Sequence, residues 1–289
     1  SDVGRPGRQH GPRTRNNNPA QRRGRDLAEV QARHDAVTAA LHTAAAAVPV
    51  AWRRGTVERG DLDRFLFDPA DIVVAVGQDG LVANVAKYLH GQPVIGVDPE
   101  PGRGPAVLVP HAAADVARLL AAVAAGTAPV LARTMAAAVC DDGQELVALN
   151  EIYLGHPSHQ SARYLIRTPH GRSEQQSSSG LVAGTSTGAT GWCASLHPHY
   201  DHAPTLPGAQ DRRLAWFVRE AWPSPSTGIS CTAGTVGAGE SLEVAVATDA
   251  LVLFGDGVES DRLTVTWGQR VMVQPADRVL VHVAVSGRG

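Results

Sequence analysis

The stretch that decides the fold is Ile72-Val73-Val74-Ala75-Val76-Gly77-Gln78-Asp79-Gly80. Its first half is a run of apolar, mostly β-branched residues, which is typical of a strand buried on both faces. Its second half is a tight turn with two glycines. The apolar residues that follow recur at helical spacing and predict a helix: Leu81, Val82, Val85, Ala86 and Leu89. A buried strand that passes through a turn into a helix indicates an α/β domain.

The neighbouring segments extend this α/β pattern. Residues Pro93–Val97 predict a second buried strand parallel to the first, and apolar positions between Val116 and Val123 predict another helix. Asp26 is a candidate N-cap, and Val48–Trp52 is a candidate short strand. After Asp26 one helical stripe follows at steps of three and four: Leu27, Val30, His34, Val37, Leu41 and Ala44. We therefore assign residues 26–126 to a Rossmann-like α/β nucleotide-binding domain.

The pattern changes after about Gly126 to short strands separated by turn residues. The predicted strands are Leu146–Leu154, Arg163–Thr168, Leu214–Val218, Ser241–Ala247, Ala250–Phe254, Leu263–Trp267, Val271–Gln274 and Val279–Val285. A helix is predicted only near Gly188–Leu196. Residues 127–289 are therefore expected to form an all-β sandwich domain.

Charge and composition exclude several classes of protein. The 289 residues carry 26 basic and 28 acidic side chains, so no overall field favours nucleic acid or an anionic membrane. There is no apolar run long enough to span a bilayer, and a cytoplasmic protein without nucleic-acid or membrane partners is expected. Lys87 is the only lysine, and no GxxxxGK[ST] motif occurs, so the chain is not a P-loop NTPase. The three cysteines form neither a disulfide framework nor a metal knuckle.

Residues 1–25 differ from the rest of the chain. They hold seven arginines, one acidic residue and almost nothing apolar. This composition favours a disordered basic arm, although a basic tail can also bind nucleic acid or acidic partners.

Three polar segments carry the chemistry. In Gly77-Gln78-Asp79-Gly80 the glycines allow backbone N–H groups to approach an anion at the helix N-terminus, and Asp79 either acts on a substrate or caps the helix. Asn150-Glu151 lies within a predicted alternating strand, where the two side chains would point to opposite faces. The segment Thr185–Trp192, preceded by Ser177–Gly184, is rich in Thr, Ser and Gly, as suits a loop that wraps a nucleotide.

Taken together, these segments resemble the NAD kinase family, whose motifs are a GGDG turn, an NE/D pair and a TPTGSTAY-like loop. The resemblance covers roughly residues 71–285 and is greatest to the branch that includes mitochondrial NAD kinases. It implies ATP- and Mg²⁺-dependent phosphorylation of the adenosine ribose 2′-hydroxyl of NAD, giving NADP, in a cleft between an α/β domain and a β-sandwich. It makes Asp79 the catalytic base. The nucleotide-binding residues that it implies are Gly77, Gln78, Gly80, Asn150, Glu151, Thr185, Thr187, Gly188 and Thr190.

The sequence departs from the family pattern at four places. Gln78 replaces a glycine, Ala189 replaces a serine, Ser179-Gly180 stands where many members carry an acidic residue, and residues 1–25 show no clear first strand. Two alternatives therefore stay open: a kinase of the same fold that acts on a nucleoside, sugar or lipid hydroxyl, and a non-catalytic nucleotide sensor. No metal ligand set is assigned, and a homo-oligomer formed through the β-rich half is expected.

Further polar groups have simpler interpretations. The spacing of His197, His199, Asp201 and His202 is compatible with a metal site, but a loop is favoured. Gly255-Asp256-Gly257 predicts a hairpin turn with a minor substrate role as the alternative, and Arg219-Glu220 predicts a surface ion pair, or an arginine that meets phosphate. Trp192 is expected to pack against the protein and not against a base.

Overall fold

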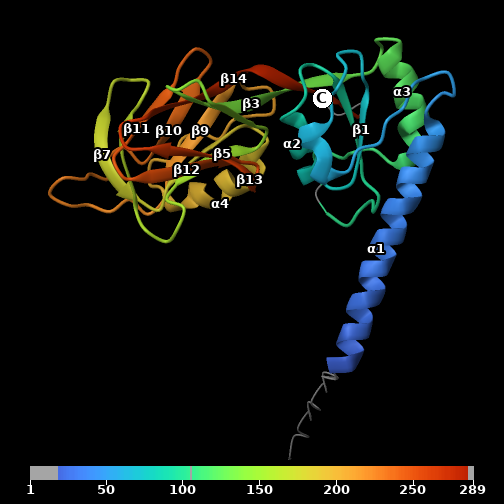
Figure 1. The fold of residues 1–289 in the computed structure, drawn as a ribbon, viewed down its shortest axis with the longest axis horizontal. Helices are drawn as coiled ribbons and strands as arrows, with labels where there is room; N and C mark the ends of the chain where they lie inside the picture. The colour runs from blue at the N-terminus through green and yellow to red at the C-terminus, as the bar shows by residue number, and fades with distance from the viewer. Residues whose placement is uncertain (1–18, 105, 286–289) are drawn as a thin grey trace, which may run out of the picture.

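A computed structural model describes residues 19–104 and 106–285, with side chains described from Leu27 onward. Two groups of elements lie side by side (Figure 1), one with helices around parallel strands and the other built from antiparallel strands. The fold is thus the predicted one, an α/β part followed by an antiparallel β part. No helix in the described part of the chain has the length and apolar character needed to cross a membrane.

The α/β part follows the sequence pattern closely. Strands β1 (Val73–Val76) and β2 (Pro93–Val97) pair in parallel, with Val73 opposite Val94. Helices α2 (Asp79–Ala86) and α3 (Val116–Ala124) follow the two strands, and their apolar faces are buried. Two short 3₁₀ helices, η1 (Arg59–Arg64) and η2 (Ala113–Asp115), complete this part. The predicted strand at Val48–Trp52 is wrong, because the chain turns there after a helix.

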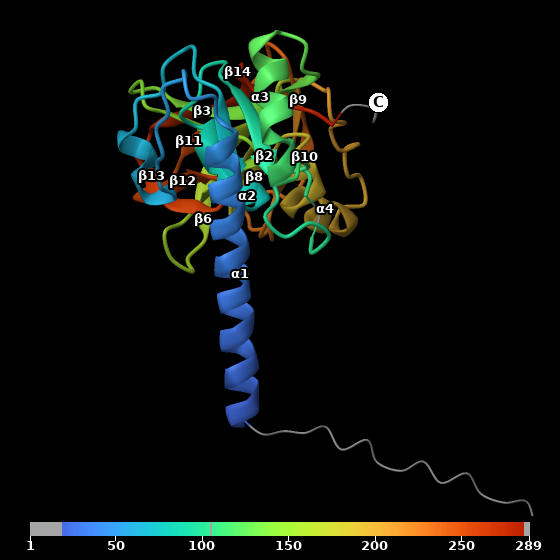
Figure 2. The same cartoon turned by 90° about the vertical axis from the view of Figure 1, so that its right-hand side faces the viewer.

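Helix α1 (Pro19–Ala47) begins seven residues before the predicted N-cap Asp26, so the predicted boundary at residue 25 falls inside it. Proline at its first position fits, since the first helical N–H needs no partner. Residues 1–18 of the predicted arm lie outside the described residues. The buried apolar residues of α1 are in its C-terminal half, at Ala40 and Ala44, while Glu29 and Arg33 form salt bridges to Arg103 and Glu100 of the loop after β2. Both views show the beginning of the helix standing away from the rest of the protein (Figures 1 and 2). Leu27 is therefore 70% exposed, although the stripe predicted its burial.

The antiparallel part contains two sheets that enclose one large apolar core. One sheet has the order β10-β9-β8-β5-β12-β13, and the other has the order β1-β2-β14-β11-β6-β7 with β3 and β4 attached through β14. The strands are β3 (Val130–Cys140), β4 (Glu145–Ala148), β5 (Glu151–Gly155), β6 (Ala162–Arg167), β7 (Ser173–Ser178), β8 (Leu181–Gly184), β9 (Arg213–Val218), β10 (Ala233–Gly237), β11 (Leu242–Val246), β12 (Ala250–Gly255), β13 (Val258–Thr266) and β14 (Arg270–Val283). The short helix α4 (Trp192–Leu196), with the 3₁₀ helices η3 (Gly188–Thr190) and η4 (His197–His199), lies where a helix was predicted.

One strand joins the two parts. The first half of β14 pairs with β11, and its last residues pair in parallel with β2, with Val281 opposite Pro93. The two strands predicted at Val271–Gln274 and Val279–Val285 are therefore one strand with an irregularity between Pro275 and Val279. The division at residues 126 and 127 stays a prediction, but the C-terminal strand returns to the α/β sheet across it.

The structure corrects the predicted strands at two places near the site. Residues Leu146–Leu154 form two strands in different sheets, β4 and β5, separated at Leu149-Asn150. Residues Ser177–Gly184, predicted as part of a loop, lie mostly in β7 and β8. Serine and glycine predict loops on their own, whereas here antiparallel partners on both sides satisfy the backbone of β8.

Candidate functional site

The Gly77–Gly80 turn lies between β1 and α2, as predicted. Gln78 is the N-cap of α2 and makes no capping bond with its side chain, which is exposed. Gly80 has open space around it, since a Cβ there would meet nothing within 4 Å. The first N–H groups of a helix lack partners within the helix, so this open turn can accept an anion.

Asp79 does not cap its own helix. Its carboxylate accepts hydrogen bonds from the backbone of the segment before η2: Oδ1 from the N–H groups of Leu108 (2.8 Å) and Val109 (3.2 Å), and Oδ2 from that of Val107 (3.1 Å). This segment also crosses β2 closely, because a Cβ on Gly96 would lie 1.8 Å from the Leu108 carbonyl oxygen. Asp79 therefore holds residues 107–109 against the sheet.

A buried arginine and a buried histidine contact the same segment. Arg133, 8% exposed, donates from Nη2 to the Val107 carbonyl and from Nε to Nδ1 of His282. His282 Nε2 lies 2.9 Å from the Leu108 carbonyl oxygen. Burial lowers the pKa of Arg133 and the Asp79 carboxylate opposes that shift, while burial and Arg133 lower the pKa of His282 to about 4. The negative charge of Asp79 thus offsets part of the cost of burying a guanidinium.

Asn150 and Glu151 lie at the break between β4 and β5. The break leaves the N–H groups of Leu149 and Asn150 without strand partners, and the Asp256 carboxylate accepts both, at 3.0 and 2.6 Å. Asp256 is at the tip of the β12–β13 hairpin, in a two-residue turn with Gly257 in which both residues have positive φ. The hairpin prediction is confirmed, and Asp256 is a supporting residue whose partners the sequence did not reveal.

The Thr185–Thr190 loop packs directly on this break. Thr185 donates from Oγ1 to the Leu149 carbonyl (2.6 Å) and from N–H to the Asn150 carbonyl (2.8 Å). A Cβ on Gly188 would lie 2.2 Å from the Asn150 oxygen, so only glycine permits this approach. Thr190 donates from Oγ1 to the Thr187 carbonyl and closes the 3₁₀ turn. The structure therefore brings the second and third predicted segments together.

Glu151 is the ionisable group at the centre of this contact. Its side chain is half-buried, and its Oε2 atom would lie 3.0 Å from a Cβ on Gly188. Burial and the charge of Asp256 raise the pKa of Glu151 to about 7. Burial also raises the pKa of Asp256 to about 6, although the Leu149 and Asn150 N–H groups and the Lys87 ammonium oppose the shift.

Lys87 connects the helix that follows the first predicted segment to the hairpin that supports the second. It follows α2, its side chain is 8% exposed, and its Nζ atom donates to the Gly255 carbonyl (3.2 Å) and to Asp261 (2.9 Å). Helix α2, which begins at Asp79, is therefore fixed to the hairpin that carries Asp256. Within the described residues the Asp79 side chain itself bonds to neither Asn150-Glu151 nor the Thr185–Thr190 loop.

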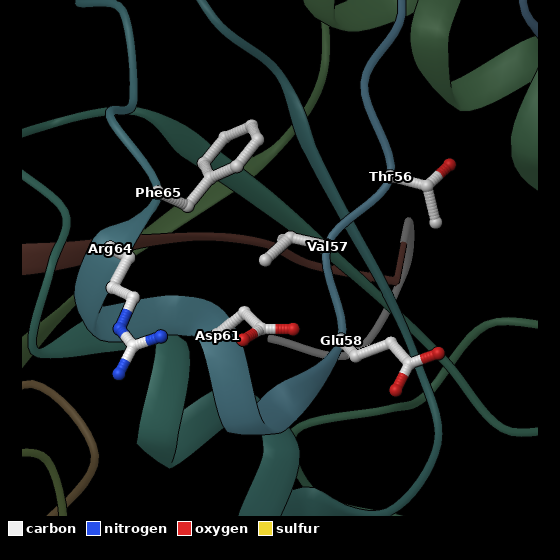
Figure 3. A pocket seen from close by; sticks show the side chains of 6 residues that line it. All are labelled: Thr56, Val57, Glu58, Asp61, Arg64 and Phe65. Carbon is white, nitrogen blue, oxygen red and sulfur yellow. The ribbon is translucent and has the colours of Figure 1, made fainter.

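Two hollows lie outside these contacts. One, of about 300 Å³, adjoins the site and is walled by Tyr153, which stacks on Trp192 with 5.7 Å between ring centroids, and by Arg219, 5.5 Å above the Trp192 ring. Trp192 thus packs on protein, as predicted. The other, of about 340 Å³, is lined by side chains of residues 56–65 around η1 (Figure 3) and contains no predicted site residue.

The remaining candidates are not brought into the site. The predicted Arg219–Glu220 ion pair is wrong: Arg219 lies over Trp192, and Glu220 accepts a hydrogen bond from Ser179. In the described residues no group of three or more His, Cys, Asp or Glu side chains could hold a metal, and His197, His199, Asp201 and His202 do not form one. Cys140, Cys193 and Cys231 are free and buried, as expected of small apolar residues.

The carboxylates of Asp79 and Glu151 fit a Mg²⁺ ion that binds together with a nucleotide, and not one that is surrounded by protein groups alone. Asp79 and Glu151 are single carboxylates on separate elements, and Mg²⁺ is commonly held by one or two carboxylates together with substrate phosphates. Asp79 keeps one of its four acceptor positions free, and the open turn at Gly80 leaves room for phosphate beside it.

The α/β part followed by an antiparallel β part is the architecture of an NAD kinase-like fold. The chain is similar to the solved structure of yeast NADH kinase in complex with NADH, with a TM-score of 0.59 and 16% sequence identity. The similarity covers 75% of this chain and 62% of the yeast chain, so the chain corresponds to somewhat less than two thirds of that protein. No family model matches the sequence, and no curated protein matches it significantly. The predicted resemblance to NAD kinases is confirmed at the level of the fold.

Proposed function

We propose that this chain is an NAD kinase-type phosphotransferase that uses ATP and Mg²⁺ to phosphorylate the adenosine ribose 2′-hydroxyl of NAD, giving NADP. The observation that carries the proposal is the contact of Gly188 and Thr185 with Asn150, which builds one site from two segments that resemble nucleotide-binding motifs. The fold shared with yeast NADH kinase supports it.

The geometry supports phosphoryl transfer in three respects. The N–H groups at the start of α2 and the open space at Gly80 are available to phosphates, whereas the Gly77 N–H is bonded to the Val97 carbonyl. The Thr185–Thr190 loop offers small side chains beside Asn150, and its hydroxyls Ser186 Oγ and Thr187 Oγ1 are buried with no hydrogen-bond partner in the described part of the chain. Glu151 offers a carboxylate that neither an arginine nor a lysine neutralises among the described residues. Mg²⁺ would supply neutralisation of the phosphate charge when bound with ATP.

The direct test is an assay of the purified protein with ATP, MgCl₂ and either NAD or NADH, with NADP or NADPH detected by an NADP-specific dehydrogenase. We expect product with ATP and none with ADP. Gly188→Ala should lower the rate of product formation at least tenfold, because the added methyl group separates the loop from Asn150. Bound NADH without product would favour a nucleotide sensor. The absence of both binding and product would favour a kinase of another hydroxyl compound.

A further inference from the structure

We propose that the hollow beside α4 is a binding site for a small aromatic monoanion, a molecule of one or two rings that carries a single carboxylate, sulfonate or similar acid group. The hollow has a volume of about 300 Å³. This is the lower end of the range for small-molecule sites, so it suits one or two rings and not a whole dinucleotide. Binding there does not require the proposed phosphotransferase function.

The hollow lies on the face of the six-stranded sheet that points away from the sandwich core. Ile152 and Leu154 of β5 are core residues, so Tyr153 between them points to the opposite face. Phe254 of β12 lines the hollow beside Tyr153, and Trp192, the first residue of α4, closes one side. The nucleotide-binding residues predicted from the sequence are not among the described residues that line it, so the hollow is a separate place on the molecule.

The apolar wall of the hollow consists of aromatic rings in fixed positions. The Tyr153 ring packs on Phe254 with 4.8 Å between ring centroids and on Trp192 with 5.7 Å. The Tyr153 hydroxyl donates to the Ser179 carbonyl (3.0 Å), which fixes the ring and uses its donor within the protein. Val252 of β12 adds a further apolar side chain. Aromatic side chains favour offset or edge-to-face contacts with other rings, so a ring is the part of the ligand that this wall accepts.

The polar wall of the hollow carries more positive than negative charge. It contains two guanidinium groups, Arg219 and Arg262, and one carboxylate, Glu259, which gives a net charge of 2 − 1 = +1. His156 adds no charge, because its Nδ1 atom accepts a hydrogen bond from the Ser158 N–H (3.1 Å) and therefore carries no proton. A wall with one net positive charge is complementary to a monoanion.

The two guanidinium groups are available to a ligand. In the described part of the chain neither takes part in an ion pair, and Glu220, the neighbour of Arg219 in sequence, accepts a hydrogen bond from Ser179 instead. Arg219 is half-buried, with its Cζ atom 5.5 Å from the centre of the Trp192 ring. The cation therefore lies beside the aromatic wall, where an acid group attached to a bound ring would meet it. Charge-assisted hydrogen bonds from arginine to such groups are among the stronger ones in proteins.

The test measures the fluorescence of anilinonaphthalene sulfonate, an aromatic monoanion, as it is titrated into the full chain. We expect saturable binding at one site per chain. Arg219→Gln and Arg262→Gln should each lower the affinity by about tenfold, the effect of losing one charge-assisted hydrogen bond. Because Arg262 is exposed, its substitution tests the site even if Arg219→Gln does not fold. Arg163→Gln is the matched control and should leave the affinity unchanged, since Arg163 is an exposed arginine of β6 in the other sheet.

Two comparisons show which features the site recognises. Phenylnaphthylamine has the same rings without the acid group, so it should bind the wild type about tenfold more weakly and should not respond to either arginine substitution. Thr187→Val removes a hydroxyl of the predicted nucleotide loop and should leave the binding of anilinonaphthalene sulfonate unchanged.

The opposite results would overturn the inference. Equal affinities for the two dyes, or equal affinities of wild type, Arg219→Gln and Arg262→Gln for anilinonaphthalene sulfonate, would mean adventitious dye binding only. A loss of affinity in Thr187→Val as large as that in Arg219→Gln would make the hollow part of the nucleotide site and not a separate one. None of these measurements involves NADP, so a wild-type protein that makes no NADP overturns the proposed function alone.

Discussion

The side chain of Asp79 lies in a predicted catalytic position, but its hydrogen bonds stabilise the structure. Its carboxylate binds three backbone N–H groups of a segment 28 to 30 residues away in sequence, and its charge faces Arg133. A local cap would have been replaceable by asparagine, since the two residues cap equally well. A carboxylate that accepts from three N–H groups cannot be replaced by asparagine in this way, because the NH₂ group of the amide accepts no hydrogen bond.

We therefore expect Asp79→Asn to lower the free energy of unfolding by about 1–3 kcal/mol, the cost of leaving a buried donor unpaired. Urea denaturation followed by circular dichroism measures this. Asp63→Asn is a suitable comparison, because Asp63 is an exposed acid of η1 and should change stability by less than about 0.5 kcal/mol. Equal effects of the two substitutions on stability would contradict a structural role for Asp79.

Glu151 gives a pH prediction with a definite sign. Its pKa in the folded protein is about 7, above the ordinary value of 4.5, so the folded state binds the proton more tightly than the unfolded state. The carboxyl therefore contributes least to stability at high pH: its contribution falls as pH rises from about 4.5 to 7. Glu151→Gln should gain stability relative to wild type by about 2–3 kcal/mol between pH 4.5 and pH 8, measured by urea denaturation at each pH. A difference that is independent of pH would contradict this.

At the scale of elements, the site is a contact between a strand break and a loop. The break at Leu149-Asn150 leaves backbone groups that would otherwise pair in a sheet; Asp256 accepts from the two N–H groups, and Thr185 donates to the Leu149 carbonyl. Neither partner could be placed from the sequence, because both lie more than 30 residues away. The sequence did signal the elements themselves: the glycines of the loop and the Asp-Gly of the hairpin.

Gly188→Ala tests this contact. A methyl group there would lie 2.2 Å from the Asn150 oxygen, so the loop must move and stability should fall by about 1–3 kcal/mol. Gly60→Ala is the control, since a Cβ at Gly60 meets nothing within 4 Å. Thermal unfolding of the two variants should separate them clearly. A Gly188→Ala protein as stable as Gly60→Ala would show that the loop does not rest on Asn150.

At the scale of the whole molecule, β14 and Lys87 make the two parts one structure. β14 is hydrogen-bonded to β2 and β11, and the only lysine of the chain joins α2 to the β12–β13 hairpin. The buried ammonium is paired with the Gly255 carbonyl and with Asp261. Lys87 thus ties the helix that begins at Asp79 directly to the hairpin that carries Asp256.

Lys87→Met should therefore destabilise the protein by about 1–3 kcal/mol, because it leaves the Gly255 carbonyl and Asp261 without their donor. Lys87→Arg keeps the charge and should lower the stability less than Lys87→Met. Chemical denaturation of both variants compares them. If methionine and arginine gave the same loss, packing and not the ammonium would hold the hairpin to α2.

The outer strands of the six-stranded sheet favour association with another chain. β10 and β13 are the outer strands of their sheet, and β10 carries no charged residue to discourage pairing with another chain. We expect a homo-oligomer formed through the β part, with at least twice the mass of one chain in light scattering at micromolar concentration. A monomer under those conditions would contradict this.

The sequence by itself determined the features that depend on near neighbours. The apolar run ending at Val76 made β1, the spacing from Leu81 to Ala86 made α2, and Asp256-Gly257 made a hairpin turn, because burial period and backbone freedom are set within a few residues. The fold class followed from the order of these elements.

Only the tertiary structure decided which groups pair over long distances. It divided Leu146–Leu154 between two sheets, bonded Asp79 to residues 107–109, and placed the Glu151 carboxylate beside Gly188 with no hydrogen-bond partner among the described residues. A sequence pattern shows how many donors and acceptors each segment has but not which of them meet. That depends on which backbone groups the packed sheets leave unpaired, and each of those must find its partner wherever the fold places one.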